Sequence, residues 1–398
     1  MSASVVHPLQ EVALMERMDR RKFLLSAAAF GGGVVLAGCG SGSSSDTGAA
    51  APAKQSHPPI GSEPGTLNIL EWQGYEAGGT KAQTYGMLAG TDYTKEFGPD
   101  GLKYTYIVND TEAVNKARQV QFDVLHPCIE NVQDYVNSKL VQPWDTSLLP
   151  SFKNLNPALT ERGKIDGQQY FIPWDWGYAS ILYRTDKVDP ADATGWELFW
   201  NPKYKGRIAM WDGAQSNFEV AALKLGFPEM DNQTSDQVEQ SKQALIEQKP
   251  LNKFYWKSEY SDMQPAFKAG DIWITYSWQD AYVNMKAEGL AVEFMQPSQG
   301  KLGWVCGFML GANTKSYRHA HKYVESFINH KAAVDMVNLF YYGNADATIT
   351  ADDVDNKALA KKLNIGDPKA LESEGVHIQN WMPNENEVAL AWQEVTAA

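Results

Sequence analysis

The chain has 398 residues, which is enough for two domains with substantial cores. Hydrophobic residues make up 43% and charged residues 21% of the sequence, as in an ordinary globular protein. The formal net charge of −13 argues against a nucleic-acid ligand and suits a cationic one. The 13 tryptophans are many for this length, and they indicate aromatic surfaces that face a ligand as well as a core.

The N-terminal residues have the pattern of an export signal. A twin arginine, Arg20-Arg21, precedes an apolar run that ends in Leu36-Ala37-Gly38-Cys39, a lipobox. We expect residues 1–39 to be a twin-arginine lipoprotein signal peptide and Cys39 to be lipidated. The alternative is an uncleaved anchor, for which the run is short. Residues 40–65 are rich in Ser, Gly, Ala and Pro and predict a flexible tether. We therefore expect an exported protein, periplasmic or held on the outer face of the cytoplasmic membrane.

Residues 67–71 are the first segment that reads as folded, and they predict a buried strand. Trp72, Gln73 and Tyr75 follow in the loop at the C-terminal end of this strand, where open α/β sheets bind their ligands. Strands and helices then alternate, which predicts a mostly parallel sheet with right-handed crossovers. The expected helices are 80–97, 109–121 and 131–138, and the expected strands are 102–108 and 122–125.

The middle of the chain contains a long apolar run, residues 170–183, which predicts a strand. Its centre at 173–177, PWDWG, is a candidate crossing between two domains. Beyond it the sequence shows no internal repeat, and the tail through Trp381 and Trp392 is expected to be mainly helical. The further expected strands are 208–211, 271–276, 291–295 and 301–310, and the further expected helices are 218–225, 263–268 and 321–330.

The common catalytic and metal-binding patterns are absent from the sequence. It contains no P-loop, HExxH or GxSxG motif and no cluster of Cys and His with metal-ligand spacing. We therefore expect no cofactor and no metal. An extracytoplasmic enzyme remains a competing hypothesis, because twin-arginine export often serves folded cofactor proteins, but no nucleophile–base spacing supports it.

Four local patterns together give a resemblance to a known group. They are Trp72–Tyr75, Ile172–Gly177, Trp196-Glu197-Leu198 with Pro202–Ile208 and Asp212, and Ala269-Gly270-Asp271 leading to Trp278. Through them residues 66–395 resemble the extracellular solute-binding proteins of bacterial ABC importers, in particular the spermidine/putrescine-binding group.

The resemblance implies an α/β, two-lobed type II periplasmic-binding-protein fold. Each lobe would be a mixed, mostly parallel sheet flanked by helices, with a ligand cleft between the lobes. It also implies no catalysis, a small-molecule ligand such as a polyamine or another organic cation, and delivery to an ABC permease; we expect a monomer. The expected boundaries are 66–176 and 301–342 for lobe 1, and 177–300 and 343–398 for lobe 2.

The resemblance also implies a set of ligand-binding residues. Cys128 falls where the group has a serine, Glu130 where it has an aromatic residue, and Cys306 where it has an aspartate that grips an amine. The aromatic residues of the group are thus kept while its acidic residues are largely replaced, and Asp280 is one candidate for the replacement charge. The full implied set is Trp72, Gln73, Tyr75, Cys128, Glu130, Asp212, Ser216, Trp278, Asp280, Trp304 and Cys306.

Aromatic faces attract cations and also bury methylene chains, so such a set suits an alkyl amine or a quaternary ammonium. The same faces stack on sugars and planar rings, and any of these residues could instead be core, Trp174 and Trp176 above all. A receptor for a neutral or anionic small molecule therefore remains the alternative, since the acidic residues are few. Besides Asp212, the carboxylates of Glu130, Asp175 and Asp280 are candidates for the charge that a cationic ligand requires.

Cys128 and Cys306 are the two cysteines that remain beyond the lipobox. In an oxidising compartment they could form a disulfide. The alternative, which we favour slightly from the sequence, is two separate buried thiols acting as small apolar side chains.

Overall fold

The structure is a computed structural model that describes residues 59–72, 75, 92–98, 100–107, 110–257 and 262–398. The signal peptide with Cys39, most of the tether, Gln73 and most of the helix expected at 80–97 lie outside the described residues. Within the described part of the chain, no helix is both long and apolar enough to span a bilayer.

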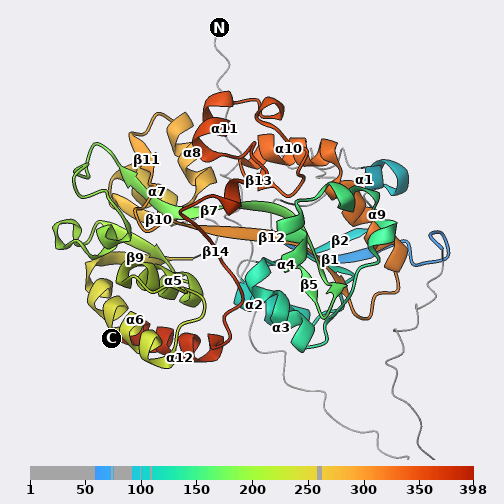
Figure 1. Ribbon diagram of the computed structural model, residues 1–398, viewed down its shortest axis with the longest axis horizontal. Coiled ribbons are helices and arrows are strands. Elements are labelled where there is room, and N and C mark those ends of the chain that lie inside the picture. Colours follow the sequence, from blue (N-terminus) through green and yellow to red (C-terminus); the bar gives the residue numbers. More distant parts are fainter. Residues whose placement is uncertain (1–58, 73–74, 76–91, 99, 108–109, 258–261) are drawn as a thin grey trace, which may run out of the picture. The chain divides into compact units, whose positions relative to one another are not determined.

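One sheet runs through the described chain, and β7 (Phe171–Arg184) and β12 (Lys301–Gly311) lie at its centre (Figure 1). The order of the main path is β2-β1-β3-β12-β7-β10-β8-β9. Strands are parallel at both ends of this path and antiparallel where β12 and β7 meet each other and their neighbours. The other bounds are β1 Leu67–Trp72, β2 Leu102–Ile107, β3 Val124–Leu125, β8 Ile208–Trp211, β9 Asn252–Trp256 and β10 Ile274–Trp278.

Short strands extend the two central ones. β11 (Val292–Phe294) and β13 (Gly343–Asn344) pair with β7, and β4 (Val141–Gln142) and β14 (Val376–Ile378) pair with β12. A separate small hairpin joins Lys164–Ile165 (β5) to Gln168–Gln169 (β6). The central strands are apolar and buried along nearly their whole length, as expected for strands covered on both faces.

The helices gather in groups around the sheet (Figure 1). At one end α5, α6 and α12 pack on one another and enclose a small core of their own. At the other end α1 contacts α9, beside β1 and β2. The bounds are α1 Asp92–Phe97, α2 Asp110–Ala117, α3 Val132–Asn137, α4 Pro157–Arg162, α5 Ala214–Leu225, α6 Ser235–Gln248, α7 Met263–Ala269, α8 Gln279–Ala287, α9 Tyr317–Ile328, α10 His330–Phe340, α11 Lys357–Leu363 and α12 Glu385–Ala397.

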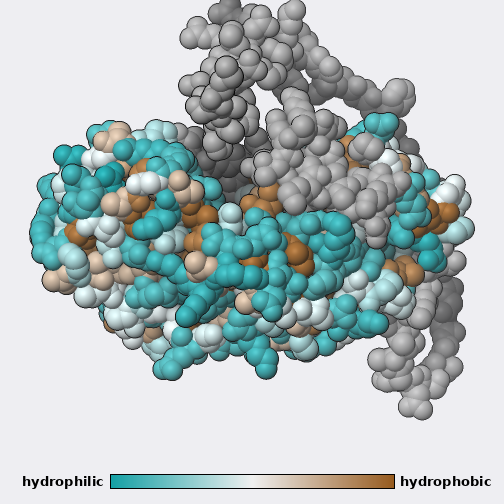
Figure 2. All heavy atoms as spheres, turned by 90° about the horizontal axis from the view of Figure 1, so that it is seen from above, coloured by the Kyte–Doolittle hydropathy of each residue, from teal (hydrophilic) through white to brown (hydrophobic). Residues whose placement is uncertain are grey.

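Local sequence explains where several of these helices begin and end. Thr234 and Gln237 form a capping box at the start of α6, each side chain bonding the backbone of the other. Gly226 and Gly270 end α5 and α7 in the left-handed conformation, which glycine adopts without steric cost. On the face seen in Figure 2, hydrophilic residues cover most of the described surface and hydrophobic residues form small separate patches.

The predicted α/β fold is confirmed, and most predicted strands match observed ones within a few residues. The strand predicted at 208–211 is β8 with the same bounds, and the apolar run at 170–183 is β7. β7 pairs with β12 through its first part and with β10 and β11 through its last part. The sequence analysis missed β9 and α6 altogether.

Candidate functional site

The ends of β1 and β3 lie side by side because the two strands are parallel neighbours. Trp72 is the last residue of β1, and Tyr75 follows three positions later; Gln73 between them is outside the described residues. His126 follows β3 directly, and Cys128 and Glu130 come next. These two loops therefore lie at the same edge of the sheet.

A first aromatic cluster, consisting of Tyr75, Phe340, Tyr342 and Trp304, forms beyond this edge. The Tyr75 and Phe340 rings are stacked with centroids 4.5 Å apart, and Phe340 is parallel to Tyr342 at 6.3 Å. Trp304 meets Tyr342 edge to face at 4.7 Å. The sequence analysis missed Phe340 and Tyr342. The aromatic run Phe340-Tyr341-Tyr342 at the end of a helix is the signal that could have pointed to them.

A second aromatic cluster contains Trp211, Trp256, Trp278 and Tyr276. Trp211, Trp256 and Trp278 are the last residues of β8, β9 and β10, three neighbouring parallel strands. Trp278 lies edge-on to Trp211 at 5.3 Å and to Trp256 at 5.4 Å, between ring centroids. Only Trp278 was predicted as a site residue, although the same strand-end rule applies to the other two tryptophans.

β7 places the two clusters on one face of the sheet. Trp304 of β12 lies opposite Gly177 of β7, and Trp278 of β10 lies opposite Ala179 of β7. Residues two apart on a strand share a face, so both indoles project on the face that carries Gly177 and Ala179 of β7. A Cβ atom at Gly177 would collide with the Trp304 ring. Glycine is therefore required for this close approach.

The predicted polar site residues Asp212 and Ser216 have different partners. Asp212 forms an ion pair with Lys257 at 2.9 Å and accepts a 3.1 Å hydrogen bond from the Trp392 indole. The Ser216 side chain forms a hydrogen bond with the Tyr276 hydroxyl. Burial raises the pKa of Tyr276, the hydrogen bond with Ser216 opposes that rise, and the charges of Glu219 and Glu130 add to it.

Asp280 lies in the first turn of α8 and acts on the first cluster. Burial raises the pKa of Tyr75 well above its ordinary value, and the negative charges of Asp175 and Asp280 raise it further. A carboxylate of β7 and one of α8 thus act on the same phenol. Trp174 and Trp176, in contrast, are fully buried, and Trp176 donates to the backbone oxygen of Asn344, so both belong to the core.

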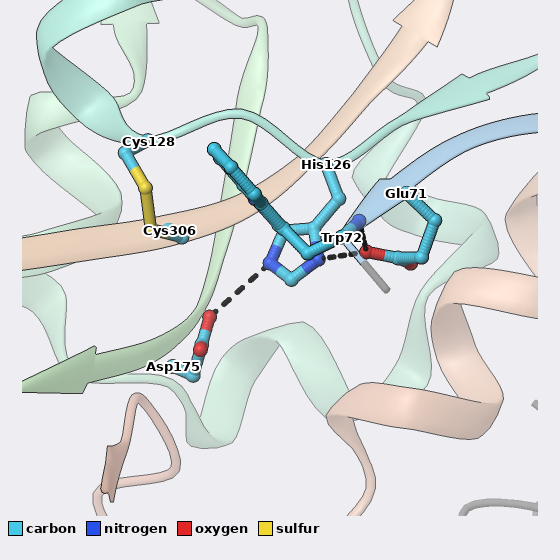
Figure 3. The surroundings of a disulfide bond; sticks show 6 residues. All are labelled: Glu71, Trp72, His126, Cys128, Asp175 and Cys306. Carbon is cyan, nitrogen blue, oxygen red and sulfur yellow. Dashed lines mark hydrogen bonds and ion pairs between the residues drawn. A yellow bond between two sulfur atoms is a disulfide. The ribbon is translucent and has the colours of Figure 1, made fainter. Parts of the chain in front are cut away.

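Cys128 and Cys306 form a disulfide (Figure 3). The expectation of two separate thiols, which the sequence analysis favoured, is therefore wrong. A backbone bridge places the two residues directly opposite each other, an arrangement that sequence spacing across 178 positions does not reveal.

Beside the disulfide lies a buried group of three ionisable side chains, Glu71, His126 and Asp175 (Figure 3). The His126 Nδ1 atom is 2.5 Å from Glu71 Oε1, and Nε2 is 3.2 Å from Asp175 Oδ1. Burial lowers the pKa of His126, but the two carboxylates outweigh this and raise it to about 10. Sequence analysis missed Glu71 and His126. Across the described ranges, no group of His, Cys, Asp and Glu side chains could hold a metal ion.

Known proteins share both the sequence pattern and the fold. The spermidine/putrescine-binding periplasmic protein of Escherichia coli is 25% identical over 279 residues, 70% of this chain and 76% of the relative. The Tp0655 (TpPotD) lipoprotein of Treponema pallidum superposes with a TM-score of 0.68 at 16% identity, covering 83% of this chain and 99% of that one.

A further solved structure has the same fold with a different ligand. The binding protein MotA from A. tumefaciens B6, in complex with glucopine, superposes with a TM-score of 0.65 at 16% identity, covering 83% of this chain and 99% of that one. Finally, the sequence model of one family matches residues 71–362, which is most of the chain. The chain therefore belongs to the family of bacterial extracellular solute-binding proteins.

Proposed function

We propose that this chain is the substrate-binding component of an ABC importer and captures a polyamine or a related organic cation. The observation that carries the proposal is the pair of aromatic clusters on one face of the sheet, with Trp304 and Trp278 flanking Gly177 and Ala179 of β7. Aromatic faces attract organic cations and bury their methylene chains. The curated relative named for spermidine and putrescine supports the same ligand class.

The proposed ligand-binding residues are those of the sequence analysis, from both clusters and the loops beside them. The lobes would divide as 66–176 with 301–342, and 177–300 with 343–398. Two facts support this division. β7 exchanges its partner from β12 to β10 and β11 along its length, and α12 packs on α5 and α6. Ligand capture involves no chemical step, so the proposal includes no enzymatic activity.

A ligand panel tests the proposed function. Isothermal titration calorimetry should show binding of spermidine or putrescine to the wild-type protein. Trp278→Ala should weaken that binding by about 1–3 kcal/mol, because stacking and apolar burial are lost. Trp200→Ala is a suitable control, since this indole donates to the backbone oxygen of Ala244 in α6. The ligand class is wrong if no amine binds and a sugar or a carboxylic acid does.

A neutral or anionic ligand is the second candidate. The Asp212 carboxylate is already paired with Lys257. Cys306 is bonded to Cys128 and has no charge for a cationic ligand. The glucopine complex of MotA shows that the same fold takes a ligand other than a simple polyamine. Opines and organic acids therefore belong in the panel beside the amines.

The proposed location is the outer face of the cytoplasmic membrane, with the protein tethered through lipidated Cys39. The twin arginine and the lipobox at 36–39 support this proposal. Cys39→Ser should move the protein from the membrane fraction to the soluble fraction of the cell. If the substituted protein stays with the membrane, the tether is assigned to the wrong residue.

A further inference from the structure

The Gln279 side chain forms two buried hydrogen bonds with backbone groups that are far apart in the sequence. Its Oε1 atom accepts from the Tyr178 N–H at 2.8 Å, and its Nε2 atom donates to the Tyr341 oxygen at 2.6 Å. Gln279 is the first residue of α8 and is fully buried. A backbone N–H only donates and a backbone oxygen only accepts, so the two partners fix which way the amide points.

Gln279 fills a gap in the hydrogen bonding of β7. β13 pairs with β7 at Asp175 and Trp176, and β10 pairs with it from Ala179 onward. Tyr178 lies between these two stretches, and its N–H bonds the Gln279 side chain in place of a strand. The Gln279 amide therefore joins β7 at the point where one neighbouring strand ends and the next begins.

The second partner, Tyr341, lies between two residues of the first aromatic cluster. Phe340 ends α10, and Tyr341 follows it in the left-handed conformation, with a φ of 57°. This conformation is uncommon for residues other than glycine, so surrounding contacts must hold it. The rings of Phe340 and Tyr342 on either side are parallel, with an interplanar angle of 4°. The Gln279 amide thus holds the turn that sets these two rings side by side.

The neighbours of Gln279 in the chain belong to the rest of the site. Trp278, directly before it, is the last residue of β10 and lies in the second aromatic cluster. Burial is the main cause of the raised pKa of Tyr75, and the negative charge of Asp280, directly after Gln279, adds to it. Three consecutive residues therefore act on both clusters, and the middle one bonds the turn at Tyr341.

We propose that Gln279 is a positioning residue of the ligand site, whose amide fixes Tyr341 and the two aromatic rings beside it relative to Trp278. This inference rests on the proposed function, in which both clusters bind the ligand. Gln279 and Tyr341 belong to different proposed lobes, so the bond between them also crosses from one lobe to the other. Gln279 acts through these neighbours and needs no contact with the ligand.

A role in folding alone leads to a different expectation. Without the Gln279 amide, the Tyr178 N–H and the Tyr341 oxygen would both lose a buried partner, which lowers stability whether or not a ligand binds. A positioning role predicts a loss of affinity as well, because the rings of Phe340 and Tyr342 are no longer held in place. Affinity and stability therefore have to be measured separately.

Gln279→Met removes both hydrogen bonds and keeps a side chain of similar length. Isothermal titration calorimetry should show an affinity for putrescine and spermidine at least about tenfold below that of the wild type at every pH. Gln233→Met is the matched control, because Gln233 is also buried and its amide donates to the backbone oxygens of Phe218 at 3.2 Å and Met230 at 2.9 Å. This control should lose stability and keep the affinity of the wild type. Thermal unfolding checks that each variant is folded.

Gln279→Glu supplies a measurement that a loss of packing would not change. A protonated carboxyl group has one oxygen that accepts from Tyr178 and a hydroxyl that donates to Tyr341, as the amide does. Burial raises the pKa of such a group above its ordinary value of about 4.3. At about pH 5 this variant should therefore bind putrescine like the wild type. As the pH rises to about 9, its affinity relative to the wild type at the same pH should fall at least about tenfold, because a carboxylate repels the Tyr341 oxygen.

The outcomes separate this inference from the proposed function. If the wild type binds an amine and folded Gln279→Met binds it equally well, the positioning role is wrong while the proposed function stands. If Gln279→Met does not fold, Gln279→Glu decides alone, and an affinity relative to the wild type that stays the same across this pH range overturns the role. If the wild type binds no amine, the proposed ligand class is wrong, and the positioning role that rests on it falls with it.

Discussion

Buried carboxylic acids in this protein differ in how their charge is balanced. Glu219 of α5 is fully buried and accepts hydrogen bonds from the amides of Gln215 at 2.7 Å and Gln379 at 2.6 Å. Burial raises its pKa to about 7, although both amide hydrogen bonds oppose the rise, and the charge of Asp231 adds to it. Glu219 therefore takes up a proton on folding at mildly acidic pH.

Glu219 should make stability depend on pH. Its pKa is about 7 in the folded protein and 4.5 in a model carboxyl group, so between these values the folded state binds more protons. The free energy of unfolding should then decrease as the pH rises through this window, by on the order of 3 kcal/mol. Urea unfolding between these pH values should show the slope, and Glu219→Gln should remove its share of it.

The exposed Glu239 of α6 supplies the control for this experiment. Its carboxylate pairs with Lys242 at 2.7 Å on the surface, and Glu239→Gln should leave the slope between pH 4.5 and 7 in place. An unchanged slope in Glu219→Gln would show that other groups carry this pH dependence.

At the scale of elements, the disulfide ties the loop after β3 to the centre of β12. Cys128 directly precedes the short 3-10 helix Ile129–Asn131, which contains Glu130, and Cys306 lies between Trp304 and Phe308. The bond therefore holds the loop after β3 against the strand that carries Trp304. It also closes a long loop, because the two cysteines are 178 residues apart.

Removing this disulfide should destabilise the protein. The double substitution Cys128→Ala and Cys306→Ala should lower the free energy of unfolding by about 2–4 kcal/mol, mainly because the unfolded chain regains freedom. Urea unfolding with and without a thiol reductant measures the effect. Reductant should destabilise the wild type similarly and leave the double variant unchanged. Equal unfolding of all samples would mean that the bond contributes nothing to stability.

At the scale of the molecule, a few connections join the two ends of the sheet. β7 and β12 run through its centre, and the segment 379–381 contacts helices on both sides (Figure 1). Asn380 accepts from Arg162 of α4 at 2.7 Å, and Trp381 donates to Asp134 of α3 at 2.9 Å. Gln379 bonds Glu219 of α5 on the other side. These few links are compatible with a hinge.

We expect the two proposed lobes to close around the ligand. Lobes joined by a small number of strands commonly respond to ligand in this way. Small-angle X-ray scattering should give a smaller radius of gyration with saturating ligand than without it. Trp278→Ala, measured at the same ligand concentration, should show a smaller change. An identical radius with and without bound ligand would contradict a closing mechanism.

Much of the fold could be predicted because strand-forming runs are local features. β1 and β8 were found from apolar residues and their flanking turn residues alone, and Trp72 and Trp278 were placed at strand ends by the same argument. β9 was missed because its residues Asn252–Trp256 are only partly buried and alternate weakly. The signal of an edge strand is weak in sequence for this physical reason.

The sequence by itself determined the α/β class, the long strand β7, and several aromatic residues at strand ends, because each depends on residues close together in the chain. The tertiary structure alone decided which distant side chains meet. Phe340 joins Tyr75, Cys128 pairs with Cys306, and His126 bonds both Glu71 and Asp175 only because strand order and register bring these positions together. Side-chain periodicity contains no information about which strands become neighbours.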